Sequence, residues 1–234
     1  MMSVRDFTSC SFCNEFLNEK NNNFYKMYLQ EEFEKNGLYS RIIAKTKNFY
    51  ILPMVGPLVP GYLLVVPKKH YVSFAFQTES ELREAQLIVK TIREIFRKFY
   101  GTSVVFEHGA LSSCVKGGCC SDHAHLHIVA VDTDIIEQFS EKGFEVREIE
   151  GITSLGTQKK RHRPYLYYEN QKDRAVIMDV GVIESQYIRK LIAKKMDVLD
   201  RALWNENYQI AWMIEIVKKL KPEFDNLRGN GLWE

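Results

Sequence analysis

The sequence has almost no surplus of charge. Its 234 residues include 32 Lys and Arg against 30 Asp and Glu, a formal net charge of +2. Proteins that bind nucleic acids or acidic membranes through general electrostatic attraction carry a much larger positive surplus. We therefore expect neither a nucleic-acid nor a membrane partner, and local sites must determine what the protein does.

Glycine and proline are also scarce, at 13 and 6 residues, whereas 45% of the residues are hydrophobic. This composition excludes collagen-like and disordered chains, and five cysteines are too few for a disulfide scaffold. A chain of this length forms one large domain or one and a half, and its core is not limited by size. The composition is typical of an ordinary globular protein.

The sequence shows no secretory or membrane-spanning pattern. Residues 1–16 carry acidic and polar side chains in place of an apolar signal segment, so we expect a cytoplasmic, reducing location. Phe49–Pro67 lacks formal charge over the length of a spanning helix. Because Pro53, Pro57 and Pro60 would break such a helix, the segment favours two buried strands.

Hydrophobic periodicity predicts an α+β fold with an antiparallel sheet of about five strands. Strands are expected at Tyr39–Lys45, Asn48–Met54, Tyr62–Val66, Val104–Phe106, His123–Val131, Tyr165–Glu169 and Ala175–Val180, and helices at Phe24–Lys35, Glu79–Tyr100, Ser185–Asp200 and Asn207–Leu220. The helix over residues 79–100 has the most regular apolar stripe, with Thr78 or Ser80 as its cap and Gly101 at its end. Pro222 is expected to end the last helix.

Three histidines alternate along one predicted strand. His123, His125 and His127 share one face, whereas Ala124 and Leu126 share the other. They are half of the chain's six histidines. Since burial of three imidazoles without partners costs several kcal/mol, and clustered titratable groups mark functional sites, the cluster predicts ligands or chemistry.

These residues resemble the signature of the histidine triad (HIT) family. Asp122–Val129 is similar to its alternation of histidines and apolar residues, and Gly61–His70 is similar to the strand, proline, basic pair and histidine found upstream. The resemblance covers about Cys10–Val131, so residues 1–132 are predicted to form a HIT-like domain and residues 133–234 a C-terminal α+β extension with a hairpin and two helices. The resemblance also implies a homodimer with paired sheets.

The resemblance implies a reaction at phosphorus. Family members are nucleotide hydrolases and nucleotidyltransferases, in which the residue matching His125 attacks an α-phosphate to form a nucleotidyl-histidine intermediate. The residue matching His127 helps to bind the phosphate and to handle protons on the leaving group. A neutral imidazole is nucleophilic near pH 7, which suits this role. The expected substrate is a nucleotide phosphoanhydride or phosphoramidate, with hydrolysis preferred over transfer.

The loop before the triad departs from the family pattern. The segment from Gly118 to Ser121 replaces the usual Gly-Gln-Ser/Thr approach, with Cys120 aligned to the hydroxyl residue and Ser121 as its alternative. Backbone N–H groups from Gly118 onward are expected to contact phosphate. Because of this departure, a second hypothesis is a nucleotide-binding or zinc-stabilised interaction module without catalysis.

Cys10 and Cys13 form a Cys-x-x-Cys pair, a spacing with which two thiolates can grip one zinc ion. The zinc-containing branch of the superfamily, which includes galactose-1-phosphate uridylyltransferase, implies His70 and His123 as the other two ligands. Such a Cys2His2 set would be structural. Two alternatives remain: a metal-free site where the two histidines contact substrate, and a site in the cysteine-rich loop 114–120.

The C-terminal residues contain two further candidates. The basic run Lys159–Arg163, within a predicted loop over Gly151–Arg163, is more typical of a solvated surface than of a nucleic-acid contact. Ser185 can cap a helix on which Gln186 and Arg189, one turn apart, project to the same side. An arginine is well suited to bind a phosphate, so Arg189 is a candidate substrate-binding residue. The alternative is that Arg189 is an ordinary surface residue.

Overall fold

The structure is a computed structural model, which describes residues 10–17, 26, 29–115, 117–118, 121–229 and 231–234. The α-helices are α1 (Ser11–Leu17), α2 (Gln30–Lys35), α3 (Glu79–Phe99), α4 (Ile136–Glu141), α5 (Tyr187–Lys195) and α6 (Ile210–Asp225). The strands are β1 (Ala44–Lys45), β2 (Phe49–Pro53), β3 (Tyr62–Pro67), β4 (Val104–Gly109), β5 (Leu126–Val129), β6 (Arg147–Ile149), β7 (Tyr165–Glu169) and β8 (Ala175–Asp179). Short 3-10 helices are η3 (Phe74–Phe76), η4 (Ile152–Arg161) and η5 (Leu199–Arg201).

Within the described residues the strands form one antiparallel sheet in the order β1-β2-β3-β5-β4-β7-β8-β6. This confirms the α+β class, but the expectation of about five strands was too small. The sheet grows because the C-terminal hairpin, β7 and β8, pairs with the free edge of β4, with Phe106 opposite Tyr168. One sheet therefore crosses the predicted boundary at residue 132, and the division into two domains stays a prediction.

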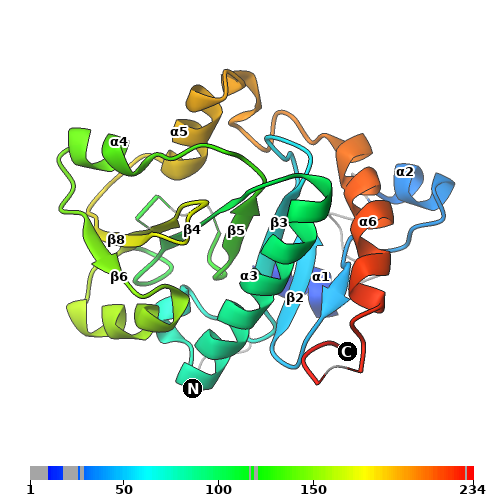
Figure 1. Cartoon of the computed structure of the whole chain (residues 1–234), viewed down its shortest axis with the longest axis horizontal. Helices are drawn as coiled ribbons and strands as arrows, with labels where there is room; N and C mark the ends of the chain where they lie inside the picture. The colour runs from blue at the N-terminus through cyan, green and yellow to red at the C-terminus, as the bar shows by residue number, and fades with distance from the viewer. Residues whose placement is uncertain (1–9, 18–25, 27–28, 116, 119–120, 230) are drawn as a thin grey trace.

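Side chains alternate across this sheet and create two apolar layers. Along β3, Leu63 and Val65 pack on the side of α3 and α6, whereas Tyr62, Leu64 and Val66 pack on the side of α1, α4 and α5. Figure 1 shows α3 crossing the sheet with α6 beside it. Both faces are covered by helices, which is why β3 is apolar along its whole length.

The helix α3 follows the sequence expectation closely. Thr78 is its N-cap and accepts a hydrogen bond from the backbone N–H of Glu81, while the carboxylate of Glu81 accepts one from the backbone N–H of Thr78. This capping box satisfies two backbone donors that the first turn leaves without partners. Just beyond the other end, Gly101 adopts a left-handed φ of 88°.

The C-terminal helices differ from the expectation at their ends. Pro222 lies inside α6 instead of ending it. Its missing N–H removes one helical hydrogen bond, but Leu220 and Phe224 are buried on the same side of the helix and Trp233 packs on the ring of Phe224. Burial on both sides of the proline therefore outweighs the lost hydrogen bond.

The start of α5 also differs. Ser185 is not its cap, because the N-cap position is held by Gln186, whose φ is 61° and whose side chain makes no capping hydrogen bond. The backbone N–H of Gln186 donates instead to the carbonyl of Gly118. This tertiary hydrogen bond turns the chain sharply just before the helix. The regular helix then stops at Lys195 rather than Asp200.

Residues 151–163 were expected to form a loop, and this was wrong for most of them. They form the 3-10 helix η4, which packs on α3 and η3. Ile152 and Leu155 are fully buried there, and such a short apolar pattern carries little periodicity to detect. Residues 159–163, the basic run, are exposed.

Two other expectations concern the N-terminal half. Of the helix predicted over Phe24–Lys35, the last residues form α2, and most of the earlier ones lie outside the described residues. Phe49–Pro67 forms β2 and β3 in antiparallel register, as predicted. In the described parts of the chain, no helix combines the length and the apolar character needed to cross a membrane.

Candidate active site and metal cluster

The three triad histidines lie on the sheet face that carries α1 and α5. Regular strand structure begins only at Leu126, so the expected strand over residues 123–131 is shorter than predicted. His127 pairs with Leu64 of β3 on one side and Phe106 of β4 on the other. All three histidines are buried, and Ala124 and Leu126 pack in the opposite layer, as the alternation predicted.

His125 is oriented by the backbone. Its Nδ1 lies 2.8 Å from the carbonyl oxygen of His123, which can only accept a hydrogen bond. Nδ1 therefore carries the proton, and the lone pair resides on Nε2. Burial lowers the pKa of His125 to about 4, so the imidazole is neutral near pH 7. A neutral imidazole with a defined tautomer is a nucleophile prepared for attack.

His127 lies next to His125 in a tightly packed setting. Its ring stacks on Phe106 with centroids 4.4 Å apart, and its Nδ1 is 2.9 Å from the hydroxyl oxygen of Tyr62. Burial, followed by the nearby His125, His108 and Arg189, holds the pKa of His127 well below its usual range. The side chain is thus neutral and fixed, which suits hydrogen bonding to a phosphate oxygen.

A fourth histidine joins this group. His108 lies on β4 two residues beyond Phe106 and faces the same side, with its ring 6.5 Å from that of His127. Its Nε2 accepts a hydrogen bond from the backbone N–H of Ile188, near the start of α5. Burial lowers the pKa of His108 to about 3. His108 is absent from the residues expected from the sequence, although its spacing of two from Phe106 on a strand places both side chains on one face.

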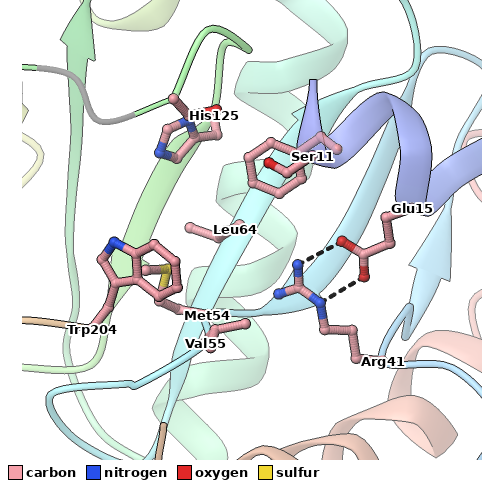
Figure 2. Close-up of a pocket in the computed structure, with 10 residues that line it drawn as sticks. Ser11, Glu15, Arg41, Met54, Val55, Leu64, His125 and Trp204 are labelled. Carbon is pink, nitrogen blue, oxygen red and sulfur yellow. Dashed lines mark hydrogen bonds and ion pairs between the residues drawn. The ribbon is translucent and has the colours of Figure 1, made fainter. Parts of the chain in front are cut away.

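Two cavities flank His125. The first, the apolar cavity, has a volume of about 130 Å³ and walls that include Phe12, Val55 and Leu64. Figure 2 shows Leu64 between His125 and the buried ion pair that Arg41 forms with Glu15, while Trp204 lies across from that pair. The second, the polar cavity, has a volume of about 20 Å³, enough for about one water-sized group. It is lined by these residues: His108, Gly118, His127, Gln186, Arg189 and Phe106. Met54, His125 and Trp204 line both cavities.

The substrate-binding candidates have different outcomes. Gly118 lines the polar cavity, with a φ of 81° and no room for a side chain beside Glu184. Ser121 lines the apolar cavity, and its hydroxyl accepts a hydrogen bond from the backbone N–H of His123. Cys120 lies outside the described residues. Arg189 is 1% exposed, so the alternative of an ordinary surface residue was wrong.

The predicted metal ligands meet beside the triad. Cys10 precedes α1, Cys13 lies within it, His70 follows β3 and His123 precedes β5. One ligand atom from each lies within 4.8 Å of the others, and within the described residues these four form the group that can hold a metal ion. The fold brings together residues that are far apart in the sequence.

The distances in this cluster fit a tetrahedral ion. Nδ1 of His123 is 3.4 Å from Sγ of Cys10 and 3.5 Å from Sγ of Cys13, and Nδ1 of His70 is 3.3 Å from Sγ of Cys13. Zinc bound at its usual distances to sulfur and nitrogen would separate such atoms by about 3.5 Å. Nε2 of His123 donates to the carbonyl of Pro67 at 2.9 Å, which leaves Nδ1 free as a ligand.

Comparisons with known proteins match part of the chain to a domain family. Residues 35–134 match the family model of the HIT domain. This segment belongs to the HIT family. An asymmetrical bis(5'-nucleosyl)-tetraphosphatase of Schizosaccharomyces pombe is 25% identical over 97 residues, which are 42% of this chain and 52% of the relative. An uncharacterised HIT-like protein of Mycoplasma genitalium is 36% identical over 76 residues, 31% of this chain and 50% of the relative.

The chain thus spans about half the length of the curated relatives it matches. Among solved structures, a zinc-bound HIT family protein from Mycobacterium smegmatis aligns with a TM-score of 0.34 and 15% identity, over 56% of this chain and 90% of that one. HIT proteins are generally nucleotide-binding hydrolases and transferases. The residues that match the HIT model supply the triad, whereas Arg189 and Trp204 come from outside it.

Proposed function

We propose that the protein is a nucleotidyl-transfer enzyme that hydrolyses nucleotide phosphoanhydrides or phosphoramidates through a covalent intermediate on His125. One observation carries the proposal: Nδ1 of His125 is held by the carbonyl of His123, so that the free Nε2 belongs to a side chain lining two cavities. A buried side chain with a purely structural role is normally packed closely by its neighbours, whereas His125 borders a cavity on each side.

The two cavities define how a nucleotide would lie. The base would occupy the apolar cavity, where Met54, Leu64 and Trp204 offer apolar and aromatic surface. The α-phosphate would then lie at His125, with one oxygen of the leaving group at the polar cavity beside His127 and His108. The loop residues Gly118 and Ser121 would contact the phosphate oxygens.

The reaction proceeds in two displacements. Nε2 of His125 forms a bond to the α-phosphorus, while the bond from phosphorus to the leaving oxygen or nitrogen breaks and its electron pair departs with the leaving group. Water then attacks the phosphorus, the P–N bond breaks, and the electron pair returns to Nε2 as the water loses a proton to solvent. Two smaller barriers replace one large barrier.

Hydrolysis is proposed ahead of transfer to a second substrate. The curated relative from Schizosaccharomyces pombe carries the name of a hydrolase, which supports this preference at the level of the shared segment. A nucleotidyltransferase would need a binding site for a second large substrate next to His125. Each cavity at His125 already has a role in binding one nucleotide.

We also propose that Cys10, Cys13, His70 and His123 hold a structural zinc ion. A set of four protein ligands leaves no open position for water, so the ion cross-links the chain rather than taking part in the reaction. It would fix α1, including Phe12, against the strand that carries His125, and the ring of Phe12 is 5.5 Å from that of His125. The zinc site thereby positions one wall of the apolar cavity.

The test compares the same substitution, histidine to asparagine, at His125 and at a control position. The wild type is incubated with a dinucleoside polyphosphate, and intact-mass spectrometry follows a nucleotidyl adduct while chromatography follows nucleoside monophosphate. His125→Asn should remove the adduct and lower kcat by about 10⁴-fold or more, because the nucleophile is lost. His162→Asn, at an exposed position with φ of 52°, is the control and should change neither result. Full activity of His125→Asn would contradict the mechanism.

The second candidate is a nucleotide-binding module without turnover. The unusual sequence from Gly118 to Asp122 favours it, because this loop approaches the reacting phosphate. Calorimetry that shows nucleotide binding, together with no adduct and no product from the wild type, would favour the module. Detection of an adduct on His125 would exclude it.

A further inference from the structure

Arg189 presents a buried positive charge whose hydrogen-bonding capacity the described part of the chain leaves partly unsatisfied. Its Nε donates to the carbonyl of Ala202, and Nη2 donates to the carbonyls of Gly56 and Arg201. The remaining nitrogen, Nη1, is buried without a hydrogen-bond partner. A guanidinium has five N–H donors, so two of them have no acceptor.

This arrangement is unfavourable unless an anion completes it. The hydrogen-bond partners of Arg189 among the described residues are backbone carbonyls, which carry no formal charge. A charge that is 99% shielded from water therefore lacks a counter-ion among the residues that the structure describes. The same carbonyls fix the direction of the guanidinium, because they come from the loop between β2 and β3 and from the segment after α5.

Arg189 lies where a leaving group would depart. It lines the polar cavity together with His125 and His127, and its guanidinium carbon is 5.4 Å from the ring of Tyr62, whose hydroxyl contacts His127. Gln186, one turn earlier at the start of α5, lines the same cavity, and its Oε1 is also buried without a partner. Two buried polar atoms without hydrogen-bond partners, Nη1 of Arg189 and Oε1 of Gln186, thus belong to residues that line a cavity beside the nucleophile.

We propose that Arg189 forms a subsite for the anionic leaving group and makes the enzyme selective for phosphoanhydrides over phosphoramidates. This inference rests on the proposed function of His125. Arginine binds phosphate oxygens through paired N–H donors, and Nη1 has two free ones. Selectivity for the substrate class would then depend on Arg189, a residue outside the segment that carries His125.

The chemistry of the two leaving groups explains the selectivity. In a phosphoanhydride the bond from the α-phosphorus to the bridging oxygen breaks, and the departing polyphosphate keeps the electron pair as negative charge. A fixed guanidinium stabilises that charge as it develops. In a phosphoramidate the P–N bond breaks, and the amine leaves only after it has gained a proton. A permanently charged guanidinium does not readily supply a proton and repels the positive charge that the amine acquires.

The experiment compares two substrates that share the adenylyl group. The ratio of kcat/KM for diadenosine tetraphosphate to kcat/KM for adenosine 5'-phosphoramidate is measured on the full-length wild type, where we expect about 100-fold or more in favour of the tetraphosphate. Arg189→Met should lower this ratio by about 30-fold, and Arg189→Lys by a smaller factor because the charge remains. Both measurements use one enzyme preparation, so a partial loss of folded protein cancels in the ratio.

A neighbouring arginine provides the control. Arg201 donates to the carbonyl of Leu58, in the same loop that Arg189 holds, and packs over Trp212, but it lines neither cavity. Arg201→Met should leave the ratio unchanged. If Arg189→Met fails to fold, competition on the wild type decides: inorganic triphosphate should inhibit tetraphosphate cleavage competitively, and a lack of inhibition would overturn the subsite.

The possible failures are distinguishable. No nucleotidyl adduct with either substrate would defeat the proposed function itself. An adduct on His125, together with a wild-type ratio near or below one or a ratio unchanged in Arg189→Met, would leave the proposed function standing and overturn the role of Arg189.

Discussion

Residues 35–134, which match the HIT domain, and the residues that follow them line the same two cavities in different ways. The matched segment supplies the triad around His125 and two of the four clustered ligands, His70 and His123, whereas Cys10 and Cys13 precede it. The extension supplies isolated side chains, Trp204 and Arg189, that reach the site only because the chain folds back over the loop between β2 and β3. The matched segment thus contributes residues that stand close together in the sequence, whereas the later residues contribute single side chains through tertiary contacts.

Residues at the two cavities are brought together in two physically different ways. Residues that lie close together in the sequence form a recognisable motif. Residues that are brought together only by tertiary contacts form none. Gly56 illustrates the second case, because a side chain there would collide with the backbone of Trp204 and Asn207. The close approach of two backbones, rather than a motif, places Trp204 at the cavity.

Removal of the proposed zinc should have the largest effect, and it should be confined to the HIT side of the comparison. A chelator, or Cys13→Ser, should remove the metal and lower the melting temperature by about 10 °C or more, since metal binding contributes several kcal/mol to folding. Metal analysis and thermal unfolding measure this. The control is Cys114→Ser, an exposed thiol outside the cluster. Unchanged metal content in Cys13→Ser would rule out the site.

Glu107 tests a contact that joins the two regions. Its carboxylate accepts hydrogen bonds from the backbone N–H of Phe74 and from the hydroxyl of Tyr165 in the extension. Burial raises the pKa of Glu107 from its ordinary value of 4.5 to about 7. Between these values the folded state binds a proton that the unfolded state has lost, so this group makes the free energy of unfolding fall as pH rises from 4.5 to 7, by about 3 kcal/mol.

The measurement is denaturant unfolding at a series of pH values. Above pH 7 the contribution of this group should be constant, because the carboxyl is ionised in both states. Glu107→Gln resembles the protonated side chain and should flatten the decline between pH 5 and 7. An equally steep decline in wild type and variant would show that other groups cause it.

Trp204→Ala should weaken nucleotide binding without a comparable loss of chemistry. Stacking of a base on an aromatic ring is worth about 1–3 kcal/mol, so KM should rise by about 10- to 100-fold while kcat changes much less. Trp212→Ala is the matched control, since this residue lies on α6 and lines neither cavity. Equal effects of the two substitutions would remove Trp204 from the site.

Thr78→Ala should have the smallest effect of these substitutions, on stability alone. It removes the cap of α3, on the sheet face away from the histidines. We expect a loss of about 1 kcal/mol in the free energy of unfolding. kcat/KM at moderate temperature should stay unchanged. A loss of activity beyond the loss of folded protein would mean that α3 affects the site directly.

Much of the HIT side could be predicted from the sequence, and the reasons are physical. The alternation of His123, His125 and His127 placed them on one face because a strand has a period of two. The Cys-x-x-Cys pair indicated a metal, and the family resemblance supplied His70. His108 escaped attention because β4 was predicted to end at Phe106, so that its register was not followed to the next residue on that face.

The rest could not be predicted, since it depends on contacts between distant segments. The partners of Arg189 are carbonyls of Gly56, Arg201 and Ala202, and no sequence pattern encodes a backbone carbonyl. The addition of β7 to the edge of β4 likewise depends on pairing across the chain, with Val105 opposite Glu169. Turn residues and periodicity predicted the hairpin of β7 and β8, but they could not predict that β7 pairs with β4.

The way this sheet ends has a consequence for association. A sheet edge attracts other chains through its unpaired N–H and C=O groups. Among the described residues the sheet ends in β1 and β6, strands of 2 and 3 residues, and β1 is further covered where Thr46 bridges Trp233. The longer edge of β4 is already occupied by β7. Edge-to-edge growth would therefore gain few hydrogen bonds, which protects against aggregation and directs any pairing of two copies to the helical faces.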